Sequence, residues 1–282
     1  MSTLAEIERA PTAPEGTGWS LWRRQVEGIV RLELRKSQRG GRAIPLLLLA
    51  ALPVVLLVLF SLAPLSAEDR EAVVPMTVFA FVFRLYYLKI GIFLGCLVAF
   101  IQLFRGDMME RSLHYYLLCP VRREVLVAAK YLVGLVTTGV VLAASTAASF
   151  LVLHLSFADS LGGGALFAHL ARYCGITVLG CAGYGAVFML AGLFFRNPVV
   201  PALVLFLWEL INPFLGPLLK KVSVIYYLIS LLPVPVSSQA LQVLSSSISP
   251  WLSVPGLVLV TAAAVAVAGF RLRRTEIRYS ED

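Results

Sequence analysis

Charge, histidine and cysteine are all scarce in this sequence. Charged residues make up 14% of the 282 residues, and the chain has three histidines and four cysteines. It contains no G-x-x-x-x-G-K-[ST] phosphate loop, no G-x-S-x-G elbow and no H-E-x-x-H pair, which mark nucleotide hydrolases, serine hydrolases and zinc proteases. The cysteines form no Cys-x-x-Cys pair, so we expect small thiols rather than a disulfide framework. We therefore expect no catalytic residues, metal or cofactor in this chain.

Apolar residues, in contrast, are abundant and are grouped into long runs. They make up 59% of the sequence, which is typical of membrane proteins. A helix needs about 20 apolar residues to cross roughly 30 Å of hydrocarbon, and continuous rather than alternating runs favour helices over a barrel. The sequence thus predicts an all-α polytopic membrane protein with six transmembrane helices. The six runs are Ile44–Leu65, Leu85–Phe104, Tyr131–Leu155, Leu170–Phe195, Val199–Leu218 and Val254–Phe270, the last extended at its outer end.

The net charge of +8 is distributed unevenly along the chain. With six helices, 18 of the 24 lysine and arginine residues fall on one side of the membrane: before the first run, between the second and third, at Arg196 and after Phe270. Cytoplasmic segments carry such an excess in multi-pass proteins. We therefore predict a multi-pass protein of a prokaryotic plasma (inner) membrane with both termini in the cytoplasm. The basic residues are expected to bind anionic membrane lipid rather than nucleic acid.

Four regions follow from these patterns. Residues 1–17 combine Pro, Ala, Thr and Glu without periodicity, which predicts a disordered leader. In residues 18–42, apolar residues that include two tryptophans recur at helical spacing opposite a basic face, which is typical of a cytosolic amphipathic helix lying in the membrane interface. Residues 43–270 are expected to form the transmembrane domain, and residues 271–282 a basic cytosolic tail.

The segment between the fifth and sixth runs is irregular. It contains the apolar stretch VSVIYYLISLL, which is too short to cross a membrane, then a Pro-Val-Pro break and a serine-rich amphipathic stretch. This pattern predicts an outer re-entrant hairpin over residues 219–253, which is either a gate or a passive lid. The apolar residues 73–83, which precede the second run, are either interfacial or an outward extension of that helix.

One acidic residue lies inside an apolar run. Glu209 is about midway along the fifth run and is followed by Asn212. An ionisable group at this depth costs at least about 2.5 kcal/mol and normally faces a cavity or a partner. Glu209 and Asn212 are therefore candidates for a translocation path, together with Arg84 and Lys89 near the outer boundary. The alternative for Glu209 is a structural contact with Arg172, Lys89 or a backbone amide of a kinked helix, and the alternative for Arg84 and Lys89 is anchoring in the headgroups.

Residues 105–130 form the longest interior segment that is too polar for lipid. The segment has an acidic start, a short stretch with spaced leucines, a proline break and a basic re-entry into the third run. It resembles the signature region of the membrane subunits of ABC exporters of the ABC-2 type, also called type V exporters. Arg111-Ser112 stands where that family often has Gly-Thr. The matching residues are Asp107, Leu113, Leu117 or Leu118, Pro120-Val121-Arg122-Arg123 and Lys130.

The resemblance covers nearly the whole chain from Gly18, and it implies a permease subunit rather than an enzyme. It implies a dimer, homomeric or heteromeric, with two separate ABC ATPase subunits that carry ATP and Mg²⁺. ATP-driven closure of these partners would push a short coupling helix, tilt the attached spans and open a central path for export. The residues expected to couple to the ATPase are Asp107, Glu110, Leu113, Leu117, Pro120, Arg122 and Arg123.

Two other classes of protein fit parts of the sequence. A stand-alone secondary transporter driven by ions would use Glu209 as its coupling acid, but such carriers usually have paired broken helices and repeated halves, and only one candidate helix is present. An integral membrane enzyme would need the catalytic groups that the chain lacks. The sequence leaves the substrate open among lipids, drugs, hydrophobic peptides, polysaccharides and ions.

Overall fold

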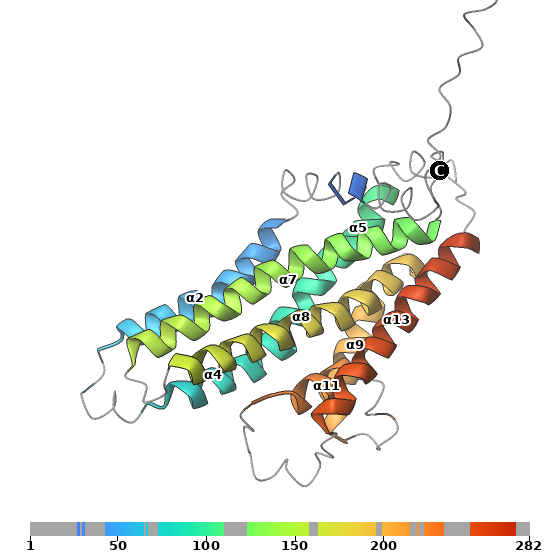
Figure 1. Cartoon of the computed structure of the whole chain (residues 1–282). Helices are drawn as coiled ribbons and strands as arrows, with labels where there is room; N and C mark the ends of the chain where they lie inside the picture. Colours follow the sequence, from blue (N-terminus) through green and yellow to red (C-terminus); the bar gives the residue numbers. More distant parts are fainter. Residues whose placement is uncertain are drawn as a thin grey trace, which may run out of the picture.

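The computed structural model of the chain shows a bundle of helices (Figure 1). All structural statements below concern the residues that it describes. For some residues only the backbone is described, namely 102, 104–109, 123–124, 199, 213, 250 and 272–274. Every regular element among the described residues is a helix. The described residues are 27–28, 30–31, 43–64, 66, 73–109, 123–157, 163–195, 199–214, 219, 223–233 and 249–274.

Five of the helices are long and apolar enough to cross a membrane. Many large apolar side chains on their outward faces are exposed, such as Leu48 at 67% and Leu259 at 70%, as expected for surfaces that face lipid tails. The prediction of an all-helical chain with several membrane spans is therefore confirmed. The five are α2 (Ile44–Leu62), the continuous helix made of α4, η2 and α5 (Pro75–Met109), α7 (Arg123–Ser156), α8 (Gly163–Phe194) and α13 (Pro250–Arg274).

The fifth predicted run forms a shorter helix. α9 covers Val199–Ile211, and a 3-10 turn, η3, follows at Asn212–Phe214. The 13 residues of α9, at about 1.5 Å per residue, give a length of about 20 Å, against a hydrocarbon core of about 30 Å. The helix ends just before Pro213, because proline disfavours the helical conformation of the preceding residue. The prediction of six transmembrane helices is therefore not confirmed by helix length.

The residues before the second run are a helical extension of it. α4 (Pro75–Val82), η2 (Phe83–Gly91) and α5 (Ile92–Met109) follow one another without a break. Pro75 is in the first turn of α4, where its missing N–H costs nothing. Of the two alternatives for residues 73–83, the structure thus shows the outward extension from Pro75 onward.

η2 is a π-helix of nine residues, a rare form that is often found at functional sites. It directs two successive tyrosines to different neighbours. The Tyr86 hydroxyl donates to the backbone oxygen of Leu49 on α2 at 2.6 Å. The Tyr87 hydroxyl hydrogen-bonds with Ser145 and Ser149 on α7, at 2.8 and 2.9 Å. η2 therefore joins α2 to α7 through the hydroxyl groups of these two tyrosines.

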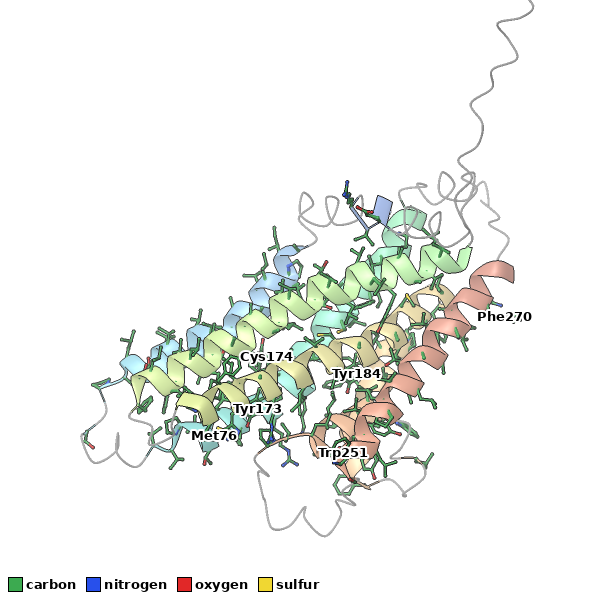
Figure 2. All side chains as sticks on the ribbon, viewed as in Figure 1. Met76, Tyr173, Cys174, Tyr184, Trp251 and Phe270 are labelled. Carbon is green, nitrogen blue, oxygen red and sulfur yellow. The ribbon has the colours of Figure 1, made fainter. Side chains whose placement is uncertain are left out.

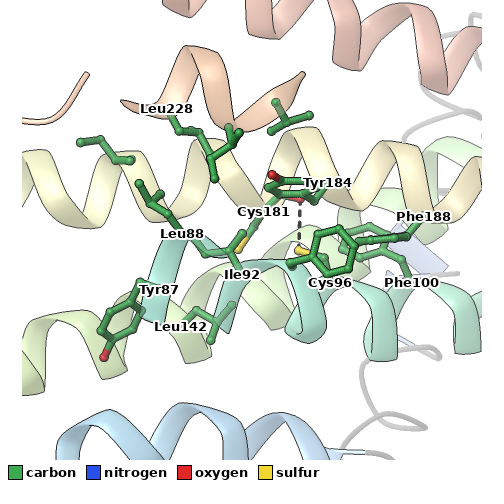
Figure 3. Close-up of a cluster of buried hydrophobic side chains, with 14 of the residues drawn as sticks. Tyr87, Leu88, Ile92, Cys96, Phe100, Leu142, Cys181, Tyr184, Phe188 and Leu228 are labelled. Atoms are coloured by element: carbon green, nitrogen blue, oxygen red, sulfur yellow. Dashed lines mark hydrogen bonds between the residues drawn. The ribbon is translucent and has the colours of Figure 1, made fainter. Parts of the chain in front are cut away.

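α8 is the central helix and contacts α5, α7 and α13. Glycines allow these close approaches: a Cβ at Gly185 would overlap the ring of Phe100 on α5, and a Cβ at Gly134 on α7 would lie 2.7 Å from the same ring. Figure 3 shows Phe100 in this core, close to Cys96 and Cys181. Cys96 and Cys181 are buried thiols. The ring of Phe100 thus fills the space that two glycines leave between three helices.

The predicted outer hairpin is described in part. α11 (Val224–Ser230) lies within it, while residues 220–222 and 234–248 fall outside the described residues. α13 begins at Pro250, so residues 250–253 belong to this span, and the boundary predicted for the hairpin is wrong there. The expected outward extension of the last run is present. Trp251, 89% exposed, lies at the end of α13 next to α11, and Phe270 lies at the opposite end (Figure 2).

Several further predictions fall outside the described residues. Where the predicted interfacial helix is described, Arg31 forms an exposed ion pair with Glu27 at 2.6 Å, a spacing of one helical turn. The parts that are not described are the leader 1–17, the rest of the interfacial helix 18–42, residues 110–122 of the coupling segment and the tail after Arg274.

Candidate functional site

Glu209 is the buried acidic residue around which the candidate site is built. It lies in the last turn of α9 with 8% of its surface exposed. Its Oε2 accepts a hydrogen bond from the Ser223 hydroxyl, and its Oε1 accepts one from the backbone N–H of Val224 at 3.2 Å. A carboxylate removed from water needs such donors to offset its lost hydration. Tyr184 from α8 and Ile225 from α11 line the same cavity as the carboxylate.

Both of these donors come from the start of α11. Ser223 is the N-cap residue of α11, and its side chain makes no capping bond to that helix, because its hydroxyl donates to Glu209. The first backbone N–H groups of a helix have no acceptor within the helix. Here the acceptor for Val224 comes from another helix. Glu209 thus attaches α9 to the N-terminal end of α11.

A small cavity adjoins the carboxylate. About 20 Å³ of it is accessible to a water-sized sphere, which is room for about one water molecule and far too little for a transported molecule. The exposed Lys89 lies at the edge of the cavity, and among the described residues no ion pair joins it to Glu209. The cavity is lined by Leu88, Lys89, Phe93, Tyr184, Phe206, Glu209, Leu210 and Ile225.

The structure brings together some of the residues that the sequence singled out. Of the structural contacts expected for Glu209, the one present is with a backbone amide, but this amide belongs to α11 and not to a kink in α9. Lys89 shares the cavity, whereas Arg172 is exposed on α8. Arg84 lies with Lys89 in η2. A role in the translocation path stays a prediction for Glu209, Asn212, Arg84 and Lys89.

Asn212 lies one turn after Glu209 and is 5% exposed. Its side-chain nitrogen Nδ2 has no hydrogen-bond partner among the described residues. An unpaired buried donor costs about 1–3 kcal/mol. Glu209 and Asn212 therefore form a buried polar patch at the end of an otherwise apolar helix.

The predicted coupling segment is described only where it joins the spans. Residues 105–109 continue α5 and residues 123–130 begin α7. The backbone of Asp107 and Arg123 is thus helical, and their side chains are outside the description. The other predicted coupling residues, Glu110, Leu113, Leu117, Pro120 and Arg122, lie outside the described residues.

Lys130, predicted as the basic re-entry, has a more specific place. It is fully buried, and its ammonium group donates to the backbone oxygen of Leu103 on α5 at 2.9 Å. One turn further along α7, a Cβ at Gly134 would lie 2.7 Å from the Leu103 side chain. The two helices that enclose the coupling segment are therefore in close contact where they leave it.

Sequence reasoning did not identify Ser223 and Tyr184 as neighbours of Glu209. Ser223 does carry a signal, since serine directly before an apolar helical stretch is a favoured N-cap. Tyr184 carries none, because it reaches the cavity beside Glu209 only through the packing of α8 beside α9.

The apolar spans, with their polar groups buried between helices, define a polytopic helical membrane protein. The sequence model of the ABC-2 family transporter proteins matches residues 29–212, which is well over half of the 282 residues. The chain belongs to this family, and the resemblance seen in residues 105–130 is confirmed. A search of curated proteins found no match.

Proposed function

We propose that the chain is the permease subunit of an ABC exporter, and that it forms the translocation path and couples to separate ATPase subunits. The observation that carries this proposal is the family match over residues 29–212, in a chain whose described residues include five helices long and apolar enough to span a membrane. Membership of this family supports partnership with ABC ATPases in general. These partners would hold ATP and Mg²⁺, because this sequence has no phosphate loop.

We also propose that α9 serves as a sixth crossing of the membrane. It follows α8 directly and runs toward α11, beside which α13 begins (Figure 1). A helix shorter than the hydrocarbon core is accommodated by local thinning of the bilayer or by oligomerisation. Six crossings put both termini on the same side, and the excess of basic residues there favours the cytoplasmic side of a plasma membrane.

The uncovered apolar face of α9 supports a second permease subunit as a partner, identical or different. α9 has few neighbours in the described chain, mainly on α8. A helix shorter than the bilayer core forces the bilayer to become thinner around it, which costs free energy. Contact of its exposed apolar face with another protein subunit avoids this cost. The exposed residues, each 46–71% exposed, are Val200, Leu203, Val204, Leu207, Leu210, Ile211 and Phe214.

The coupling residues make the proposal testable. We propose that the ATPase contacts Asp107, Glu110, Arg122 and Arg123, and that ATP-driven closure pushes the segment that holds Leu113, Leu117 and Pro120. Such a switch works only if the contact differs between nucleotide states.

The experiment reverses two charges in the coupling segment. Arg122→Glu combined with Arg123→Glu should abolish co-purification with the ATPase encoded by an adjacent reading frame, and should abolish ATP turnover by the complex. Arg273→Glu combined with Arg274→Glu, at the end of α13, is the matched control because the change in charge is the same. Unchanged co-purification and turnover in the first variant would contradict the coupling assignment.

An ion-coupled carrier is less well supported. Its coupling acid would exchange ions or protons with water, whereas the Glu209 carboxylate is buried and hydrogen-bonded to α11. An adjacent reading frame with a phosphate loop would favour the exporter, and its absence would favour the carrier.

A further inference from the structure

We propose that α11 is a lid over the Glu209 cavity, held in place by contacts at both of its ends, and that it must leave this seat during transport. Glu209 is then the positioning residue for the lid. The proposal rests on the exporter function proposed above. It goes further by naming the moving element and the residues that hold it.

α11 depends on its neighbours for its position. It has seven residues, whereas isolated helices shorter than about 12–15 residues are marginal in water. The described residues on either side of it, Ser223 and Leu231–Pro233, are not helical. The free energy that keeps α11 in place must therefore come from tertiary contacts, and removing a few of them should release it.

The first contact fastens the N-terminal end of α11 to α9. The Glu209 carboxylate accepts hydrogen bonds from the Ser223 hydroxyl and the backbone N–H of Val224. Hydrogen bonds to a charged group are stronger than those between neutral groups, so this contact can decide the position of so short a helix. In the chain, α9, which carries the carboxylate, is separated from the donors by residues 212–222. The formation of α9 alone therefore does not bring them together.

The second contact is an apolar seat on α8 and α13. Val224 and Leu228 are 4% and 0% exposed. A Cβ at Gly183 would lie 2.9 Å from the Val224 side chain, and a Cβ at Gly180 would lie 3.1 Å from the Leu228 side chain. Leu228 points from α11 into the core in Figure 3. α11 therefore packs closely against α8 at the places where glycines have no side chain.

The third contact fastens the C-terminal end of α11 to α13. The hydroxyl oxygens of Ser230 and Ser253 are 2.6 Å apart and hydrogen-bonded. Ser253 is fully buried. Close to it, a Cβ at Gly256 would lie 2.7 Å from the Tyr227 ring. α11 is thus held by polar bonds at both ends and by apolar packing between them.

α11 covers polar groups that are unusual at this position. Ile225, in the first turn of α11, is one wall of the cavity that also contains Glu209 and Lys89. With α11 in place this cavity holds about one water, so it cannot pass a substrate. If α11 leaves its seat as a unit, this wall is removed and the carboxylate is exposed beside Lys89. α11 thus closes a small cavity whose lining includes one acidic and one basic residue.

The serine pair allows the lid to be locked. The variant Ser230→Cys/Ser253→Cys places two thiols where oxygen atoms are now 2.6 Å apart, close to the roughly 2.05 Å of a disulfide bond. We expect an oxidant to crosslink them within the chain. In vesicles of phosphatidylethanolamine and phosphatidylglycerol that contain the permease with its ATPase, oxidation should lower ATP turnover severalfold, and a reductant should restore it. The two single-cysteine variants, treated in the same way, are the controls for the native cysteines.

The yield of this crosslink also tests the role of Glu209 in a way that needs no ATPase. In membranes that contain only the permease, adding Glu209→Gln to the cysteine pair should lower the rate of crosslinking severalfold, since α11 is no longer held over the site. Ser223→Ala should lower it less, because the backbone bond from Val224 remains. Tyr86→Phe removes a partly buried hydrogen bond between η2 and α2, and it should leave the rate unchanged because that bond does not involve α11.

The outcomes separate this proposal from the proposed function. Full ATP turnover in crosslinked permease would overturn the movement of the lid, even though the complex is an exporter. An unchanged crosslinking rate in Glu209→Gln would overturn the positioning role. A complex that neither forms nor hydrolyses ATP in the parent protein contradicts the exporter function itself, while the crosslinking rates still report whether Glu209 holds α11.

Discussion

The carboxylate of Glu209 on α9 accepts a hydrogen bond from the hydroxyl of Ser223, the residue that precedes α11. This bond connects two features that look unrelated along the chain: an acid inside an apolar run and a short helix in an irregular segment. It also changes the question about Glu209. If α11 moves as proposed, the carboxylate makes a structural contact in one state of the protein and loses it in another, so the structural and functional alternatives are compatible.

Replacing Glu209 by glutamine should destabilise the protein. The amide keeps one acceptor oxygen but turns an N–H₂ group toward donors, and a buried donor without a partner costs about 1–3 kcal/mol. Glu27→Gln is the control, because it removes an exposed ion pair with Arg31, and such pairs contribute about 0–1 kcal/mol. Thermal unfolding in detergent should give a clearly lower midpoint for Glu209→Gln. Equal midpoints would mean that the carboxylate is not needed for this fold.

Two buried tyrosines should respond differently to loss of the hydroxyl group. Tyr87 and Tyr173 are both fully buried, but the Tyr87 hydroxyl bonds with Ser145 and Ser149, whereas the Tyr173 hydroxyl has no partner in the described part of the chain. Tyr87→Phe should cost about 1 kcal/mol or more of unfolding free energy. Tyr173→Phe should be neutral or stabilising. Thermal unfolding should therefore give a lower midpoint for Tyr87→Phe than for Tyr173→Phe. The reverse order would contradict the hydroxyl network described for η2 and α7.

Two glycines offer a test of the helix packing around Phe100. A Cβ at Gly185 would overlap the Phe100 ring, whereas a Cβ at Gly139 would meet only the Val178 side chain, at 3.9 Å. Gly185→Ala should destabilise the protein by about 1–3 kcal/mol through overpacking. Gly139→Ala should stabilise it by up to about 1 kcal/mol, since alanine is the better helix former. Adding Phe100→Leu should recover part of the loss in Gly185→Ala, and failure to recover any would argue against this contact.

The number of membrane crossings has a direct test. With α9 as a crossing, tags attached to the two ends of the chain are on the same side of the membrane, whereas five crossings put them on opposite sides. We expect protease added to the outside of spheroplasts to spare both tags, and protease added to inverted vesicles to remove both. A tag inserted after Asp159, between α7 and α8, is the control and should show the opposite behaviour. Protection of one terminal tag alone would show that α9 does not cross.

Much of this fold could be predicted from the sequence, because each span is specified by its own residues. A run such as the one in α2 is apolar along its whole length, and a helix is the structure that satisfies its backbone in lipid. Residues 105–130, the predicted coupling segment, stand out for a similar reason, since their charges cannot lie in hydrocarbon. The failures lie where the local signal is weak. The apolar run at 199–218 continues past Pro213, although α9 ends before this residue. The hairpin predicted over 219–253 includes Pro250, which begins α13.

The sequence by itself determined that this protein is a bundle of membrane-spanning helices of the ABC-2 type, because hydropathy, charge asymmetry and the pattern of residues 105–130 are all local properties. Only the tertiary structure decided which polar groups meet. Glu209 and Ser223 are 14 residues apart, and Tyr87 and Ser145 are 58 apart. Such pairs form because helices that pack side by side leave no water to take the place of a missing partner, and that packing depends on the shapes of several helices at once.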